Sequence, residues 1–287
     1  MSGVFGFGLD YKYGARYPGG IEGLCERYRD RLSHLSIVAI ETADEARSFR
    51  QLAGSLPVIH HLSNVAPGNP SGPDLERLRK QDAFSGILEA VWCGEDIGVW
   101  QLGPYPLPYF APPVFDADVA RWIGEGVIQI TERSRVPFLV ETPSCSYVTG
   151  TIDLGEFFRT ITDTAGCPIV LDVSHVFSYA LAAERPALEV LANIPLERVW
   201  EIHIAGGRVD EAYPFRYIDS HSDPIMSGVY EVLAESVRRC RNLRCVTYEI
   251  GVGLTAEMIE HDVAKLETIL HGASMVPDFS VPQEWPS

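Results

Sequence analysis

Several predicted strands of this sequence end in an acidic residue or a histidine. The apolar run at residues 169–171 is followed at once by Asp172 and, three residues later, by His175. A carboxylate and an imidazole at the end of a buried strand are costly to remove from water unless they have partners. The same ending recurs along the chain and gives these candidate site residues: His61, Asp96, Glu141, Asp172, His175, His203, Asp219, His221 and Glu249.

A mixed set of histidines and carboxylates predicts a transition-metal site. Such sets bind Zn, Mn or Fe, whereas Ca and Mg prefer oxygen ligands alone. Carboxylates crowded on one rim repel one another unless cations are present. At about three or four ligands per ion, the candidate set suggests roughly two or three ions.

The elements that must position these residues alternate along the chain. Strands are predicted at residues 4–9, 34–41, 56–61, 90–93, 137–141, 168–173, 199–203 and 245–249. Helices are predicted at residues 21–32, 42–54, 74–89, 116–135, 153–165, 225–241 and 255–270, with one helix or a pair of helical turns reaching residue 193. Thr42 and Glu45 form a predicted capping box at the start of the second helix.

Strict alternation of strand and helix implies a parallel sheet, and eight units imply a closed α/β barrel of the (β/α)8 type. Active sites of such barrels lie at the C-terminal ends of the strands, where the candidate residues fall. We predict one barrel domain at residues 3–272 and an irregular tail at 273–287. Residues 98–113 are rich in proline and are predicted to be a long loop, which in a compact domain is usually functional. Residues 206–223 are predicted to be a long polar loop.

Composition narrows the class of protein. The chain has 287 residues, of which 46% are hydrophobic and 22% charged, as in ordinary globular proteins. A net charge of −16 with no basic run argues against a nucleic-acid partner. No stretch is long and apolar enough to span a membrane, and the N-terminus lacks the features of a signal peptide. The six scattered cysteines include no Cys-x-x-Cys pair, which favours reduced thiols and a cytoplasmic location.

Five motifs carry a resemblance to a known family. They are Glu141-Thr142-Pro143, Leu171-Asp172-Val173-Ser174-His175, Ile202-His203-Ile204-Ala205-Gly206, Asp219-Ser220-His221 and Tyr248-Glu249. In order and spacing, the chain from His61 to Glu249 resembles the multinuclear non-haem iron-dependent oxidative enzymes, the family of the methanobactin-forming oxygenase. The resemblance implies a (β/α)8 barrel with two or three iron ions. It also implies O2-dependent modification of cysteine residues in a ribosomally synthesised precursor peptide, with a small partner protein that presents the peptide.

The same residues resemble a second, more distant group, the endonuclease IV-type and xylose isomerase-like barrels. That likeness implies a division of the ligands: Glu141, Asp172, His203 and Glu249 around a central ion; His175, Asp219 and His221 around a second; His61 and Asp96, with Glu141 bridging, around a third. A Zn- or Mn-dependent hydrolase or a sugar isomerase is the alternative function. A binding protein that has lost its chemistry is the third class.

Several positions stay open. His60 and His61 are adjacent on a strand and therefore face opposite ways; the family pattern favours His61 as the ligand. Asp96 stands where both groups usually have a histidine, so it is either a ligand or an acid beside the ligands. Cys93 and Cys145 lie near strand ends as buried bystanders or as thiols of the site. The aromatic residues of the 98–113 loop either grip a peptide or only cover the site.

Overall fold

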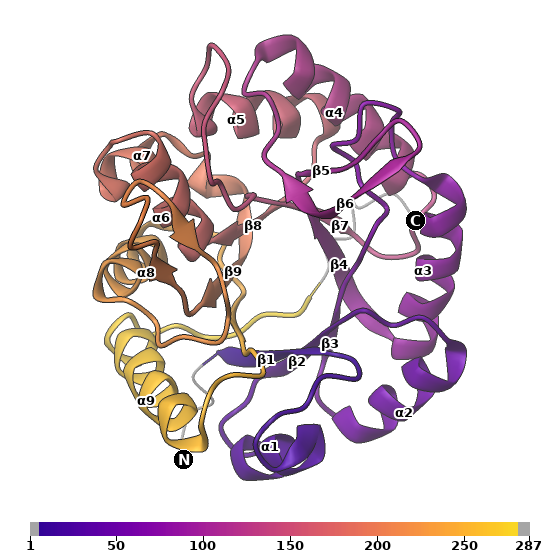
Figure 1. Cartoon of the computed structure of the whole chain (residues 1–287). Coiled ribbons are helices and arrows are strands. Elements are labelled where there is room, and N and C mark those ends of the chain that lie inside the picture. Colours follow the sequence, from indigo (N-terminus) through magenta and orange to yellow (C-terminus); the bar gives the residue numbers. More distant parts are fainter. Residues whose placement is uncertain (1–5, 281–287) are drawn as a thin grey trace.

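Eight parallel strands close into a ring in the computed structural model, which describes residues 6–280 (Figure 1). In ring order they are β1 (Phe7–Lys12), β2 (His34–Val38), β3 (Val58–His61), β4 (Ala90–Asp96), β7 (Phe138–Glu141), β8 (Ile169–Asp172), β9 (Val199–Ala205) and β12 (Cys245–Glu249). The ring closes between β12 and β1, where Glu249 lies in register with Asp10. The predicted (β/α)8 barrel is therefore confirmed.

Helices surround the ring on its outer side (Figure 1). They are α1 (Gly20–Tyr28), α2 (Ala43–Ala53), α3 (Leu75–Leu88), α4 (Ala117–Thr131), α5 (Leu154–Ala165), α6 (Val173–Ala182), α7 (Ala187–Asn193), α8 (Ser227–Arg239) and α9 (Ala256–Gly272). The capping box of Thr42 and Glu45 is present at the start of α2. The helical segment predicted up to residue 193 is the pair α6 and α7.

The alternation of side chains along each strand explains why the polar residues point into the barrel. Residues two apart on a strand face the same side of the sheet. Ile59, Leu139 and Val170 pack in one buried apolar cluster that also contains Trp92. His61, Glu141 and Asp172 each follow one of these three residues by two positions, so they face the same interior one layer nearer the C-terminal end.

The two predicted loops contain short antiparallel hairpins. The segment 98–113 forms β5 (Val99–Leu102) and β6 (Tyr105–Ala111), and the polar loop forms β10 (Arg208–Val209) and β11 (Tyr217–Ile218). The prediction of a strand-free loop at 98–113 is wrong. The prolines of this segment favour a loop, but each strand of an isolated hairpin has one free edge, where a residue without an N–H, such as Pro106 or Pro108, is tolerated.

Several strands run further than predicted: β4 was predicted to end at residue 93 and β9 at residue 203, whereas they end at Asp96 and Ala205. The first strand was predicted at residues 4–9, but within the described residues it runs to Lys12 and so includes Asp10. Residues 273–280 after α9 have no helix or strand, as predicted for the tail. Phe279 stacks on Trp92, with ring centroids 5.6 Å apart, so the tail covers the N-terminal end of the barrel. Residues 281–287 of the predicted tail lie outside the described residues, and the domain boundary at 272 stays a prediction.

No helix within residues 6–280 is both long and apolar enough to cross a membrane.

Candidate metal centre

Glu141 lies at the middle of the cluster. Its Oε2 is 3.1 Å from His61 Nε2, and its Oε1 is 2.9 Å from His203 Nδ1. Glu249 approaches the same two histidines, with its Oε1 3.2 Å from His203 Nδ1 and 3.6 Å from His61 Nδ1. Four strand ends, β3, β7, β9 and β12, therefore meet at one point.

The Asp172-x-x-His175 pair is built by a helix cap. Asp172 is the N-cap of α6, and its Oδ1 accepts a hydrogen bond from the backbone N–H of His175 at 2.8 Å. This is the usual N-cap bond to the third helical residue. It leaves Asp172 Oδ2 buried without a hydrogen-bond partner. One oxygen fixes the helix, and the other is free for a ligand.

The loop after β11 brings two more candidates to the cluster. Asp219 Oδ2 is 2.9 Å from His175 Nε2 and 3.3 Å from His221 Nε2. His221 Nε2 is also 3.6 Å from Glu249 Oε2. Asp96, at the end of β4, lies between two histidines: its Oδ2 is 3.8 Å from His61 Nε2 and its Oδ1 is 3.5 Å from His175 Nδ1. All nine predicted residues are thus brought together, and their roles as ligands stay a prediction.

Two of the histidines are oriented by hydrogen bonds to groups outside the nine candidate residues. His203 Nε2 donates to Glu201 Oε1 at 3.0 Å, and His175 Nδ1 donates to the backbone carbonyl of Thr142 at 2.6 Å. Histidines that bind metals commonly donate their second N–H in this way, which fixes the tautomer and the ring. Glu201 is itself held by Trp92 Nε1, which donates to its Oε2 at 2.7 Å.

Several of the candidate ligand atoms have no hydrogen-bond partner within the protein. Glu141 Oε1 and Oε2, Asp96 Oδ1, Asp172 Oδ2, Asp219 Oδ1, His61 Nδ1 and His203 Nδ1 are buried and form no hydrogen bond of acceptable geometry. Unsatisfied buried polar atoms are rare in folded proteins, so a group of them at one point indicates a missing partner. Several sets of three, such as Asp172, His203 and Glu249, have ligand atoms within 4.8 Å of one another.

The excess of negative charge in the cluster also indicates a metal site. The cluster holds more carboxylates than imidazoles even when Asp10, on β1 beside Glu249, is left out. Within residues 6–280, no Lys or Arg forms an ion pair with any of these carboxylates. Buried charges need partners or metal ions. The residues therefore fit one or more cations.

The pKa values of the metal-free site reflect this crowding. Burial raises the pKa of Asp172 to about 7, against the opposing charge of His175. Burial and the charge of Glu141 raise the pKa of Asp96 to about 6. Burial opposes protonation of His203, yet the charges of Glu141 and Glu249 hold its pKa well above the ordinary value. Protons thus partly offset the repulsion in the absence of a metal ion.

Other histidine, acidic and cysteine residues near the strand ends lie outside the cluster. His60 Nδ1 is 2.8 Å from Ser85 Oγ on α3, so His60 faces outwards while its neighbour faces inwards. Glu95 accepts hydrogen bonds from the backbone N–H groups of Val65 and Ala66, which anchors the loop after β3. Cys93 and Cys145 are free, buried thiols that belong to the hydrophobic core, so the reading as buried bystanders is the one the structure supports.

Sequence reasoning missed two residues of this neighbourhood. Asp10 follows an apolar run as the other acids do, but the predicted strand ended at residue 9, whereas β1 runs to Lys12. Glu201 lies two residues before His203 on the same strand and so faces the same interior. Both signals were present in the sequence.

A cavity of about 540 Å³ opens onto the cluster. Among the residues that line it are His61, Asp219, His221 and Glu249, together with Lys12 of β1. The hairpin contributes Trp100 and Tyr109 to its wall, so the predicted functional loop does border the site.

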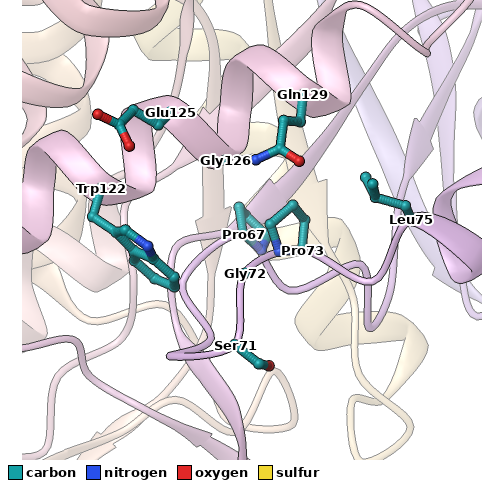
Figure 2. A pocket seen from close by; sticks show the side chains of 9 residues that line it. All are labelled: Pro67, Ser71, Gly72, Pro73, Leu75, Trp122, Glu125, Gly126 and Gln129. Atoms are coloured by element: carbon teal, nitrogen blue, oxygen red, sulfur yellow. The ribbon is translucent and has the colours of Figure 1, made fainter.

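A separate hollow of about 300 Å³ lies between α4 and the loop before α3 (Figure 2). Trp122, Glu125 and Gln129 of α4 line it together with Pro67 and Pro73, and none of the nine candidate residues lines it. With a single carboxylate and no histidine, this hollow is not part of the metal centre.

The backbone around His221 leaves no room for a side chain at residue 251. A Cβ added to Gly251 would lie 2.2 Å from the carbonyl oxygen of His221, closer than any such contact in proteins. We therefore expect Gly251→Ala to displace His221, to cost about 1–3 kcal/mol of stability and to weaken metal binding. Thermal unfolding and metal titration measure both effects. Gly272→Ala, where the added Cβ meets nothing within 4 Å, is the control; equal metal affinity in the two variants would contradict the expectation.

The sequence matches one protein-family model and is similar to several curated proteins. The family model described as "RiPP precursor modification enzyme MbnB/TglH/ChrH" matches residues 35–268. Similar curated proteins include a UPF0276 protein of Paraburkholderia phytofirmans, 26% identical over 226 residues that cover 75% of this chain and 68% of the relative. Another is a UPF0276 protein of Rhizobium meliloti, 31% identical over 196 residues that cover 64% of this chain and 61% of the relative. The chain spans about two thirds of the length of these relatives.

Solved structures share the fold. Endonuclease IV of Thermus thermophilus superposes with a TM-score of 0.58 at 17% identity, covering 93% of this chain and 99% of that one. A xylose isomerase-like TIM barrel protein of Mycobacterium smegmatis gives 0.58 at 12% identity, covering 95% and 99%. The predicted xylose isomerase-like barrel is therefore confirmed. With the family model matching most of its length, this chain belongs to the MbnB/TglH/ChrH family of RiPP precursor modification enzymes.

Proposed function

We propose that this protein oxidises cysteine residues of a ribosomally synthesised precursor peptide with O2, at a centre of two or three iron ions. The observation that carries the proposal is the group of buried, unpartnered ligand atoms that opens onto a cavity. The family supplies the class of substrate, a RiPP precursor peptide.

The chain's own residues supply binding and orientation. Carboxylates and imidazoles suit iron, and bound iron would supply one-electron chemistry with O2 and a position for a thiolate sulfur. His175 and His203 are held by Thr142 and Glu201, so their other ring nitrogens keep a fixed direction. Lys12 lines the cavity and favours an anionic group of the substrate there.

The surface around the cavity suits a peptide. Large apolar side chains are exposed on several of the loops that follow barrel strands: Leu102, Tyr105, Tyr109, Tyr147, Tyr213, Phe215 and Val252. Exposed apolar surface gathered on one face is typical of an interaction site. The rim therefore offers contacts to a precursor peptide and to a small partner protein that presents it.

The proposal is tested by co-expressing the protein in iron-rich medium with each short cysteine-containing peptide encoded beside its gene. We expect a mass change confined to one peptide, lost when its cysteine is replaced by serine and absent without O2. A Cys→Ser peptide that is modified equally, or a modification that proceeds without O2, would overturn the proposed chemistry. The His60→Gln protein, altered outside the cluster, is the matched control for variants of the ligands.

A further inference from the structure

Asp10 adds a carboxylate to the centre that the sequence motifs do not include. It lies on β1, in register with Glu249 of β12. The ligand atoms of Asp10, His61 and Glu249 all lie within 4.8 Å of one another. Only 4% of Asp10 is exposed, and its Oδ1 has no hydrogen-bond partner. A buried, unpartnered carboxylate oxygen beside an imidazole and a second carboxylate points to a ligand that binds all three.

The two nitrogens of His61 face two different sets of carboxylates. His61 Nε2 faces Glu141 at 3.1 Å and Asp96 at 3.8 Å. His61 Nδ1 faces Glu249 at 3.6 Å and has no hydrogen-bond partner, and Asp10 lies beside the same Glu249. A neutral imidazole offers a lone pair on one nitrogen and an N–H on the other. His61 can therefore serve an ion on either side, and its tautomer decides which.

The cavity distinguishes the two sides. Asp10, His61 and Glu249 all line the 540 Å³ cavity, whereas Asp96 and Glu141 do not. An ion on the Nδ1 side would have three protein ligands and an open face towards the cavity, the arrangement typical of catalytic rather than structural metal sites.

We propose that Asp10, His61 Nδ1 and Glu249 hold a divalent cation on the cavity side of the centre, with its open positions available to substrate. The ligand role of Asp10 depends on this geometry alone. Only the identity of the ion as iron, and its role towards a thiol, rest on the proposed function. Two carboxylates and one imidazole suit Fe, Mn or Zn.

A purely structural role for Asp10 would involve its neighbour on β2. Ser36 lies in register with Asp10, and its hydroxyl also has no hydrogen-bond partner. If Asp10 served mainly to contact Ser36, loss of either side chain would lower stability alike and leave the metal content unchanged. If Asp10 is a metal ligand, loss of its carboxylate lowers metal binding, whereas loss of the Ser36 hydroxyl does not.

The test compares wild type, Asp10→Asn and Ser36→Ala, each stripped of metal and titrated anaerobically with Fe(II) and separately with Zn(II). The number of bound ions per chain is measured by elemental mass spectrometry. Unfolding of the metal-free proteins is followed by calorimetry. We expect Asp10→Asn to bind one ion fewer, or to bind its weakest ion at least about tenfold less tightly, while Ser36→Ala binds as wild type does. Metal-free Asp10→Asn should melt no lower than metal-free wild type, because the substitution removes one of several crowded negative charges.

Equal ion number and affinity in wild type and Asp10→Asn would overturn the ligand role. So would metal-free Asp10→Asn and Asp10→Ala proteins that both fail to fold, because a free ligand oxygen is not needed for the fold. If wild type binds zinc but never iron, and Asp10→Asn binds one zinc ion fewer than wild type, the role of Asp10 is supported and the iron chemistry is refuted. Iron loading with no effect of Asp10→Asn would refute the role of Asp10 and leave the proposed function standing.

Discussion

Glu141→Gln is expected to empty the centre of most of its metal. Glu141 directs one oxygen at His61 and the other at His203, and neither oxygen has a hydrogen-bond partner. An amide keeps the shape of the side chain but offers one acceptor and no charge. Residues that merely orient metal ligands already cost about 10- to 100-fold in affinity or activity when changed. Because Glu141 is shared by two histidines, its loss should lower both metal affinity and activity by more than about 100-fold.

The matched control is Glu95→Gln. Glu95 is a buried carboxylate on the neighbouring strand, but its oxygens accept backbone hydrogen bonds of 3.1 and 3.0 Å from Val65 and Ala66. The control should lose about 1–3 kcal/mol of stability, the usual cost of an unsatisfied buried group, and keep its metal. Metal content and peptide oxidation are measured for both proteins. Full metal content in Glu141→Gln would show that the cluster does not bind metal through this residue.

Metal removal is expected to lower the thermal stability of the wild type strongly. Ligands that bind only the folded state stabilise it by about 4 kcal/mol when present at roughly a thousand times their Kd. For a chain of this size each kcal/mol raises Tm by roughly 2 °C, so a single ion should raise Tm by about 8 °C. Relief of repulsion among the buried carboxylates is the physical source of the gain.

Calorimetry of chelator-treated and reloaded protein measures this shift, and Glu141→Gln treated in the same way is the control. The variant should show a much smaller difference between its metal-free and loaded forms. An unchanged Tm on loading wild type, at metal concentrations that saturate any site, would contradict the assignment of the cluster as a metal centre.

The barrel could be predicted because several strands leave the same local signal. An apolar inward-facing residue stands two positions before His61, Glu141 and Asp172, and the same periodicity that fills the lower barrel directs these side chains to the upper rim. The Asp172-x-x-His175 pair is likewise local, since it is an N-cap and the third residue of its helix.

Contacts between distant segments could not be read from the sequence alone. Asp219 Oδ2 lies 2.9 Å from His175 Nε2 although 44 residues separate the two, because the loop between β9 and α8 folds back over the rim. The contact of Asp96 with both His61 and His175 depends in the same way on how neighbouring strands are offset. The resemblance to a family grouped Asp219 with His175 and Asp96 with His61, but it did not give the contact of Asp96 with His175.

Strand register accounts for the missed Asp10. Its contact with His61 and Glu249 arises where the first and last strands close the ring, and a prediction that ends the strand at residue 9 leaves this acid in a loop. The hairpin of β5 and β6 was missed for a different reason. Proline marks a break in a central strand, but it carries much less weight in a strand with one partner.

Metal analysis of protein purified without oxygen, together with its visible spectrum, tests the proposed chemistry most directly. We expect two or three iron ions per chain and an absorption band that changes when O2 or a cysteine-containing peptide is added. Stoichiometric zinc with no iron, even from cells grown in iron-rich medium, would contradict an iron-dependent oxidation and favour a hydrolytic role for the same cluster.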